Sequence, residues 1–167
     1  MDQPLGKYLP IYSIDCSINI YLYQNYFIHC YLFIFFFFRK VLFWDDLVYP
    51  LVNPRAIAVA PYDGLMFWTD WHEEFPKIER ASMDGNPNSR IVIINATNGW
   101  PNGLTLDYQN RFLYWVDAKA KHIARSDWNG NYVKILYRDG RNDNVLQRPF
   151  AISVHQSLLF WTDFDDK

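Results

Sequence analysis

Three tripeptides of the form W-x-D carry the side chains best suited to chemistry in this sequence. They stand 47 and 46 residues apart, at Trp68-Thr69-Asp70, Trp115-Val116-Asp117 and Trp161-Thr162-Asp163. An aspartate can act as a general base or as a metal ligand, but a buried carboxylate without hydrogen-bond partners is costly. Because the same acid returns at a nearly constant period, we expect it to have a structural role in a repeated unit.

Other landmarks recur in the same order around each tripeptide. A proline lies 14 residues before the first two tryptophans and 12 before the third, at Pro54, Pro101 and Pro149. Each proline leads into a small residue and then two apolar residues separated by one, as in PRAIAV and PNGLTL. Downstream, KIERASMDGN and HIARSDWNGN align Arg80 with Arg125. Four landmarks in fixed order indicate an internal repeat.

Each repeat must position its tripeptide on a strand. The alternating apolar residues after each proline are typical of a half-buried strand, and FWTD or YWVD suits a pleated surface packed on both faces. Asp84-Gly85 and Asn129-Gly130 are strong hairpin signals, for which we expect type I′ turns. Four short strands in roughly 40–50 residues, without a convincing amphipathic helix, predict a β-propeller blade.

We therefore predict an all-β region over residues 41–167, with about two and a half four-stranded blades. The expected blades span about 50–97, 98–145 and 146–167, the last one incomplete. Propellers close with about four to eight blades, and an open ring exposes unpaired strand edges. We expect the chain to be a fragment of a longer propeller.

The motifs PRAIAV, MFWTDW, PKIERASMDG and GWPNGLTLDY, between residues 54 and 108, resemble the YWTD, or class B, repeats of the low-density lipoprotein receptor family. These motifs are most similar to those of the large receptor-related endocytic members. The resemblance extends over about residues 50–167 and implies a partial six-bladed β-propeller of YWTD type. In that family, six blades close a ring that is flanked by EGF-like modules, in the extracellular part of a single-pass membrane protein.

The same resemblance implies a function at the cell surface. We expect an extracellular ligand-binding or scaffold module of a receptor-related protein, acting in receptor-mediated endocytosis of protein or lipoprotein ligands, with no cofactor and no nucleic-acid partner. The alternative within the family is a co-receptor in Wnt-type signalling. Asn95-Ala96-Thr97 is the only N-x-[ST] tripeptide in the sequence, and we expect a glycan on Asn95 if the chain is secreted.

An enzyme is the alternative from another class. The sequence lacks G-x-S-x-G, H-E-x-x-H, a P-loop and a cysteine cluster with metal-ligand spacing. Pro101-Asn102-Gly103 is similar to the PNG turn of calcium-dependent lactonase-like propellers, in which Asn102 would bind the metal. Arg55 and Phe150 stand at the matching places, where an arginine would repel a cation and a phenylalanine supplies no ligand. We therefore predict no enzymatic activity.

Two further predictions concern the W-x-D repeats and the loop after the first. Arg80, Arg125 and nearby backbone N–H groups are the expected partners of the three repeated aspartates, and Val116 removes one hydroxyl from the second repeat. After Asp70, the segment DWHEEF offers Trp71, Glu73 and Glu74 as a protein-binding loop, especially for basic ligands. A solvated loop with a packed tryptophan is the alternative.

The net charge and the histidines give little further indication of function. A net charge of −2 with 20% charged residues gives no sign of a nucleic-acid-binding arm or an acidic tail. His72, His122 and His155 lie near predicted strand ends, where we expect them to be solvated. The alternative role is a pH switch, because imidazole titrates between neutral and endosomal pH.

The first forty residues do not resemble the repeats. Residues 18–38 form an apolar stretch of 21 residues, which is long enough to cross a bilayer, but the basic pair Arg39-Lys40 follows it. That order conflicts with a standard signal peptide and would keep the blades on the cytoplasmic side. The segment 1–40 also holds both cysteines, Cys16 and Cys30. It is either an artefact of the gene model or a membrane segment.

Overall fold

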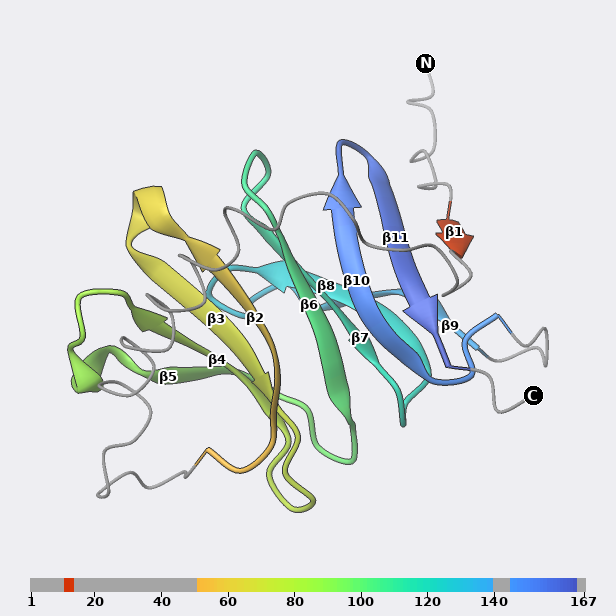
Figure 1. The fold of residues 1–167 in the computed structure, drawn as a ribbon, viewed down its shortest axis with the longest axis horizontal. Helices are drawn as coiled ribbons and strands as arrows, with labels where there is room; N and C mark the ends of the chain where they lie inside the picture. Colours follow the sequence, from red (N-terminus) through yellow and green to blue (C-terminus); the bar gives the residue numbers. More distant parts are fainter. Residues whose placement is uncertain (1–10, 14–50, 140–144, 165–167) are drawn as a thin grey trace, which may run out of the picture.

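The computed structural model describes residues 11–13, 51–139 and 145–164. This part of the chain forms three β-sheets that stand side by side (Figure 1). Apart from strands it contains two short 3-10 turns, η1 (Pro61–Asp63) and η2 (Pro87–Ser89). No helix in the described ranges has the length and apolar character needed to span a membrane. The predicted apolar segment 1–40 lies outside the described residues, except for 11–13.

The first two sheets each contain four antiparallel strands in chain order. The first is made of β2 (Pro54–Ala60), β3 (Leu65–Asp70), β4 (Lys77–Ser82) and β5 (Ile91–Asn95). The second is made of β6 (Pro101–Asp107), β7 (Phe112–Asp117), β8 (His122–Asp127) and β9 (Lys134–Arg138). Each sheet is the four-stranded unit that the repeat predicts.

The third sheet contains the antiparallel pair β10 (Pro149–His155) and β11 (Leu158–Asp163). A short strand from the other end of the chain, β1 (Ile11–Ser13), pairs with β11 in parallel. From Pro54 onward the described residues thus hold four, four and two strands, which confirms the predicted grouping. The fold is that of adjacent propeller blades.

The three sheets share one register. Trp68 pairs with Ile57, Trp115 with Leu104, and Trp161 with Ile152, so each repeated tryptophan lies on the strand that follows the leading proline's strand. In each sheet the register shifts once between the leading proline and the next apolar pair. The repeat therefore reproduces an irregularity of the backbone as well as the pattern of side chains.

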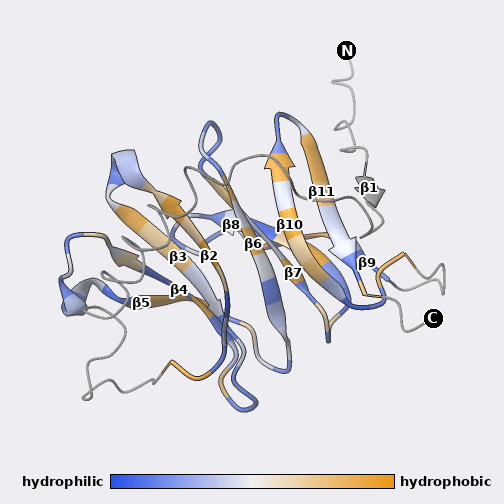
Figure 2. Ribbon diagram, in the orientation of Figure 1, coloured by the Kyte–Doolittle hydropathy of each residue, from blue (hydrophilic) through white to orange (hydrophobic). Residues whose placement is uncertain are grey.

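Apolar side chains fill the spaces between neighbouring sheets, and Figure 2 shows apolar segments, coloured orange, on strands of all three sheets. Between the first two sheets, Phe67 lies edge-on against Trp128, with ring centroids 5.6 Å apart. A second cluster joins β7 and β8 to the third sheet and includes Tyr114, Leu159 and Trp161. Each fully buried large apolar side chain contributes about 1.5–3 kcal/mol, so these clusters stabilise the stack of sheets.

The hairpin turns differ from the predicted type. Gly85 and Gly130 both have φ of 83°, but neither Asp84 nor Asn129 has a positive φ, so the type I′ turn is wrong at both places. At the second turn the Gly130 N–H donates to the Asp127 carbonyl, and the Asp127 carboxylate accepts from the Asn129 N–H. The Asp127 carboxylate thus accepts backbone N–H groups of the turn. Of the pair Asn129-Gly130, only the glycine takes the left-handed conformation.

Candidate functional site

The three repeated aspartates anchor the chain where it enters the first strand of each sheet. These strands, β2, β6 and β10, begin at the leading prolines and are called the inner strands. Asp70 is fully buried and accepts the Val52 and Asn53 N–H groups, at 3.2 and 2.7 Å. Asp117 accepts the Trp100 N–H at 2.9 Å. Asp163 holds the chain before Pro149 in the same way, by accepting the backbone N–H groups of Gln147 and Arg148. These carboxylates position the backbone that precedes each leading proline.

The predicted arginine partners of these aspartates are wrong, and the strand register explains why. On β4, Lys77 faces Asp70, whereas Arg80 faces Phe67, which places Arg80 about 10 Å further along the strand. Arg80 donates instead to the Trp128 carbonyl in the second sheet. Arg125 lies over the Phe112 ring, 4.1 Å from its centroid. The backbone N–H groups that were also expected do fill this role.

The hydroxyl of the motif joins one blade to the next. Thr69 Oγ1 accepts the Ala56 N–H at 3.0 Å and donates to the Asn102 carbonyl of β6 at 2.8 Å. In the third sheet Thr162 Oγ1 accepts the Ala151 N–H at 3.1 Å. Val116 takes this place in the second sheet and has no hydroxyl to offer.

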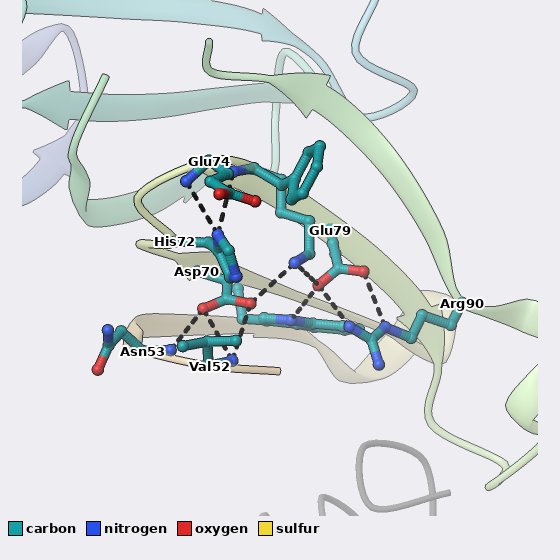
Figure 3. A network of polar contacts seen from close by, with 10 residues as sticks. Val52, Asn53, Asp70, His72, Glu74, Glu79 and Arg90 are labelled. Atoms are coloured by element: carbon teal, nitrogen blue, oxygen red, sulfur yellow. Dashed lines mark hydrogen bonds and ion pairs between the residues drawn. The ribbon is translucent and has the colours of Figure 1, made fainter. Parts of the chain in front are cut away.

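Beside Asp70 the first sheet contains a buried chain of ion pairs (Figure 3). Lys77 Nζ lies 2.9 Å from Asp70 Oδ2, and the Arg90 guanidinium lies 2.8 Å from both oxygens of Glu79. Trp68 Nε1 donates to Glu79 Oε2 at 3.0 Å. The side chains of the four charged residues are at most 4% exposed. Two acids and two bases leave this group with no net charge.

The second sheet places His122 where the first has Lys77, opposite Asp117. Its Nδ1 is buried and has no hydrogen-bond partner among the described residues, so the expectation of a solvated ring is wrong for this nitrogen. Burial lowers the pKa of His122 below its usual value, Asp117 opposes that shift, and Arg138 adds to it. By contrast, His155 is exposed, and His72 Nδ1 accepts the N–H groups of Glu74 and Phe75 (Figure 3).

A hollow of about 240 Å³ opens at the end of the sheets where the inner strands begin. Its walls come from the residues beside each leading proline and after each repeated aspartate. They are Arg55, Trp71, Trp100, Asn102, Ala118, Arg148, Phe150 and Phe164. Trp71 and Trp100 lie 4.9 Å apart between ring centroids, and the Arg55 guanidinium stands 4.7 Å over Trp71. We call this feature the aromatic hollow.

The aromatic hollow alters what the sequence predicted for the loop after Asp70. Trp71 lines it, but Glu73 and Glu74 are exposed and are not among its lining residues. The charged groups that do line it are the guanidinium groups of Arg55 and Arg148. The walls of the aromatic hollow are therefore cationic, and the preference for basic ligands stays a prediction for the exposed Glu73 and Glu74 outside it.

Asn102 lies in the wall of the aromatic hollow and contacts both neighbouring sheets. Its side-chain Nδ2 donates to the Pro149 carbonyl at 3.1 Å, and its own carbonyl accepts from Thr69. In the described part of the chain, no group of three His, Cys, Asp or Glu side chains could hold a metal ion. The asparagine serves as a link between blades.

Comparisons with known proteins agree with this architecture. Residues 64–108 match the low-density lipoprotein receptor repeat class B family. The chain is 40% identical over 117 residues to the vitellogenin receptor Yl of Drosophila melanogaster, which covers 69% of this chain and 5% of that receptor. It is 38% identical over 124 residues to low-density lipoprotein receptor-related protein 5-like protein of Homo sapiens, which covers 74% and 44% of the two chains.

A solved structure shows the same likeness. One chain in the crystal structure of a nidogen–laminin complex superposes with a TM-score of 0.59 at 37% identity, over 68% of this chain and 40% of that one. This chain thus spans less than half the length of each of these relatives. The matched family is one of receptor repeats rather than of enzymes. The chain carries a low-density lipoprotein receptor class B, or YWTD, repeat domain.

Proposed function

We propose that this domain is an extracellular ligand-binding module of a cell-surface receptor that takes up protein or lipoprotein ligands by endocytosis, with EGF-like modules flanking the propeller. The observation that carries the proposal is the aromatic hollow. Phe150 and Phe164 are 46% and 58% exposed within it, and Trp100 is 37% exposed. Large rigid aromatic side chains and arginines are the residue types that dominate binding energy at protein interfaces.

The chemistry of the aromatic hollow defines the ligand that fits it. The paired rings favour an apolar side chain of the ligand, since aromatic faces give a large contact area at a low cost in conformational entropy. Arg55 and Arg148 favour a carboxylate or a carbonyl group next to that side chain, because guanidinium groups donate paired hydrogen bonds. We therefore expect a ligand segment that combines an acidic and an apolar residue.

Binding to purified proteins tests the proposal. Vitellogenin and laminin are the two probes, because the receptors of Drosophila melanogaster and Solenopsis invicta are named for the first and the nidogen chain was solved with the second. We expect the full chain to bind one of them, and Arg55→Ala to weaken that binding about tenfold or more. Tyr62→Ala is the matched control, because Tyr62 is fully exposed in the turn at the opposite end of the first sheet. Equal loss in both variants, or no binding of either probe, would contradict the proposal.

Uptake into cells tests the location separately. An antibody against the blades should label intact cells that express the full chain, and the label should move inside on warming. Labelling that appears only after permeabilisation would sink the extracellular assignment. Surface labelling that stays in place would favour the signalling co-receptor alternative over an endocytic one.

A further inference from the structure

We propose that Asn95 carries an N-linked glycan that stands at the outer edge of the first sheet and leaves the aromatic hollow open. The modification takes place in the secretory pathway, so the inference rests on the extracellular location in the proposed function. It adds a covalent modification to one named side chain and specifies which side of the domain remains available to a ligand.

The acceptor tripeptide is exposed and well arranged for the reaction. Asn95 and Thr97 are both exposed, and Thr97 Oγ1 donates to Asn95 Oδ1 at 2.7 Å. No hydrogen bond to Asn95 Nδ2 occurs among the described residues, so this nitrogen is open to attack an electrophile. Asparagine at the first place and a hydroxyl residue at the third are what the glycosyl transfer requires.

The transfer balances with one co-reactant, an oligosaccharide linked to a lipid diphosphate. Asn95 Nδ2 forms a bond to the anomeric carbon of the sugar while the bond from that carbon to the phosphate oxygen breaks. The lipid diphosphate leaves with the electron pair of that bond, and the amide nitrogen gives up one proton. Nothing is oxidised or reduced, and the side chain keeps one N–H.

The fold places the glycan away from the aromatic hollow. Asn95 is the last residue of β5, and β5 is the outer strand of a sheet ordered β2-β3-β4-β5 (Figure 1). Because the strands are antiparallel, Asn95 lies at the same end of the sheet as the start of β2, and Trp100 of the hollow follows it by five residues. Asn95 is nevertheless three strands to the side of β2, or about 14 Å at the usual strand spacing. A glycan on Asn95 therefore starts from the outer edge of the blade, and its attachment point is not among the lining residues of the hollow.

The outer strand also has a surface for the glycan to shield. Ile91 and Val92 of β5 are 42% and 41% exposed. An exposed strand edge with apolar side chains invites pairing with other chains. A bulky, well-hydrated glycan at the end of this strand hinders that approach, so the same group would protect the edge and keep ligand access to the other side.

The test expresses the full chain in animal cells, without an added leader, and measures its mass before and after treatment with peptide N-glycosidase F. We expect wild type to lose the mass of one glycan and to gain an aspartate at position 95. Asn95→Gln and Thr97→Ala should carry no glycan, whereas Thr97→Ser should retain it. Two independent negative variants guard against loss through misfolding of one of them.

A second acceptor reports whether the chain enters the secretory pathway at all. Asn131→Thr converts Asn129-Gly130-Asn131 into an acceptor tripeptide. Asn129 and Asn131 are both exposed, and no hydrogen bond from Asn129 Nδ2 occurs among the described residues. If this variant is modified at Asn129 while Asn95 stays bare, the glycan inference is wrong and the extracellular location stands. If neither asparagine is modified, both the location and the inference fail.

The position of the glycan has its own readout. Asn95→Gln should bind vitellogenin or laminin, whichever wild type binds, with an affinity within about twofold of the wild-type value, because the glycan stands clear of the aromatic hollow. An affinity that rises tenfold or more when the glycan is absent would show that it covers the hollow, and would overturn that half of the inference.

Discussion

The first and second sheets have the same strand order, the same register and the same aspartate anchor. They differ in the side chains of the third strand that face the anchor and its neighbouring tryptophan. The first buries Lys77 and Glu79 in a chain of ion pairs, whereas the second has His122 and Ala124 at the same places in the register. A buried ion pair and an apolar replacement of it are often nearly equal in stability. The comparison shows that the anchor fixes the blade, while the contents of this layer can change.

The two joints between sheets differ as well. Between the first and second sheets, Thr69 bridges to the Asn102 carbonyl. Between the second and third, Val116 has no hydroxyl, and Gly103 lets the backbone of β10 come so close that an added Cβ would lie 2.7 Å from the Phe150 carbonyl oxygen. The first joint has a threonine bridge, whereas the second combines the Asn102 side-chain bond to the Pro149 carbonyl with close contact of two backbones.

The largest effect should follow from breaking the ion pairs of the first sheet. Glu79→Ala removes the acceptor of Arg90 and Trp68 from a layer with almost no solvent access. We expect a loss of about 3–5 kcal/mol in the free energy of unfolding, because a buried charge loses its partner. Urea unfolding of the full chain measures it. Adding Arg90→Val to this variant should recover part of the loss, and a cost below about 1 kcal/mol for the single change would refute the account.

The next effect should come from the glycine at the second joint. Gly103→Ala forces a methyl group against the backbone of β10, and we expect it to cost about 1–3 kcal/mol through overpacking. The matched change is Ala56→Gly, at the same place in the first sheet, which should cost about 0.5–1 kcal/mol because glycine weakens a strand. If Gly103→Ala proved the milder of the two, the close approach would not be needed.

A smaller effect should distinguish the threonines. Thr69→Val removes two hydrogen bonds, one within its sheet and one to the next, and we expect about 0.5–1.5 kcal/mol per bond. Thr162→Val removes the single bond from the Ala151 N–H at a partly exposed site, so its cost should be lower. Denaturant midpoints of the two variants, measured side by side, decide this, and equal costs would show that the bridge between sheets adds nothing.

The smallest effect should be a dependence of stability on pH through His122 in the second sheet. The folded-state pKa of His122 lies below its usual value of 6.5, so the unfolded chain takes up the proton first. Stability should therefore be full above about pH 6.5 and fall as the pH drops below it. Urea midpoints at about pH 7.5 and about pH 5.5 measure the fall, which His122→Gln should reduce. A wild-type midpoint that rises on acidification would have the wrong sign.

The sequence predicts the repeated backbone well because periodic residues report on it directly. The three tryptophans lie on second strands, 14, 14 and 12 residues after the leading prolines. The sequence predicts the hydrogen-bond and ion-pair partners of a side chain poorly where they depend on strand register. Arg80 was expected beside Asp70, but Lys77 faces the aspartate because β4 begins there.

The candidate site was predicted only in part. Trp71, Arg55, Asn102 and Phe150 were singled out for other reasons. Trp100 and Arg148 were not, because they are far from Trp71 in sequence and meet it only when the sheets stack. A signal was present in the alignment of the repeats, since Arg55, Asn102 and Phe150 follow equivalent prolines. What that alignment cannot give is the distance between their side chains.

The most direct test of the whole account compares two tryptophans that are 15 residues apart. Trp115 is 3% exposed within the repeat, whereas Trp100 is 37% exposed in the aromatic hollow. Vitellogenin or laminin affinity and the urea midpoint should be measured for Trp100→Ala, with Trp115→Ala as the comparison. We predict that Trp100→Ala keeps the wild-type midpoint and loses about tenfold or more in affinity, while Trp115→Ala loses about 3–5 kcal/mol of stability. Wild-type affinity in a folded Trp100→Ala variant would contradict the assignment of ligand binding to the aromatic hollow.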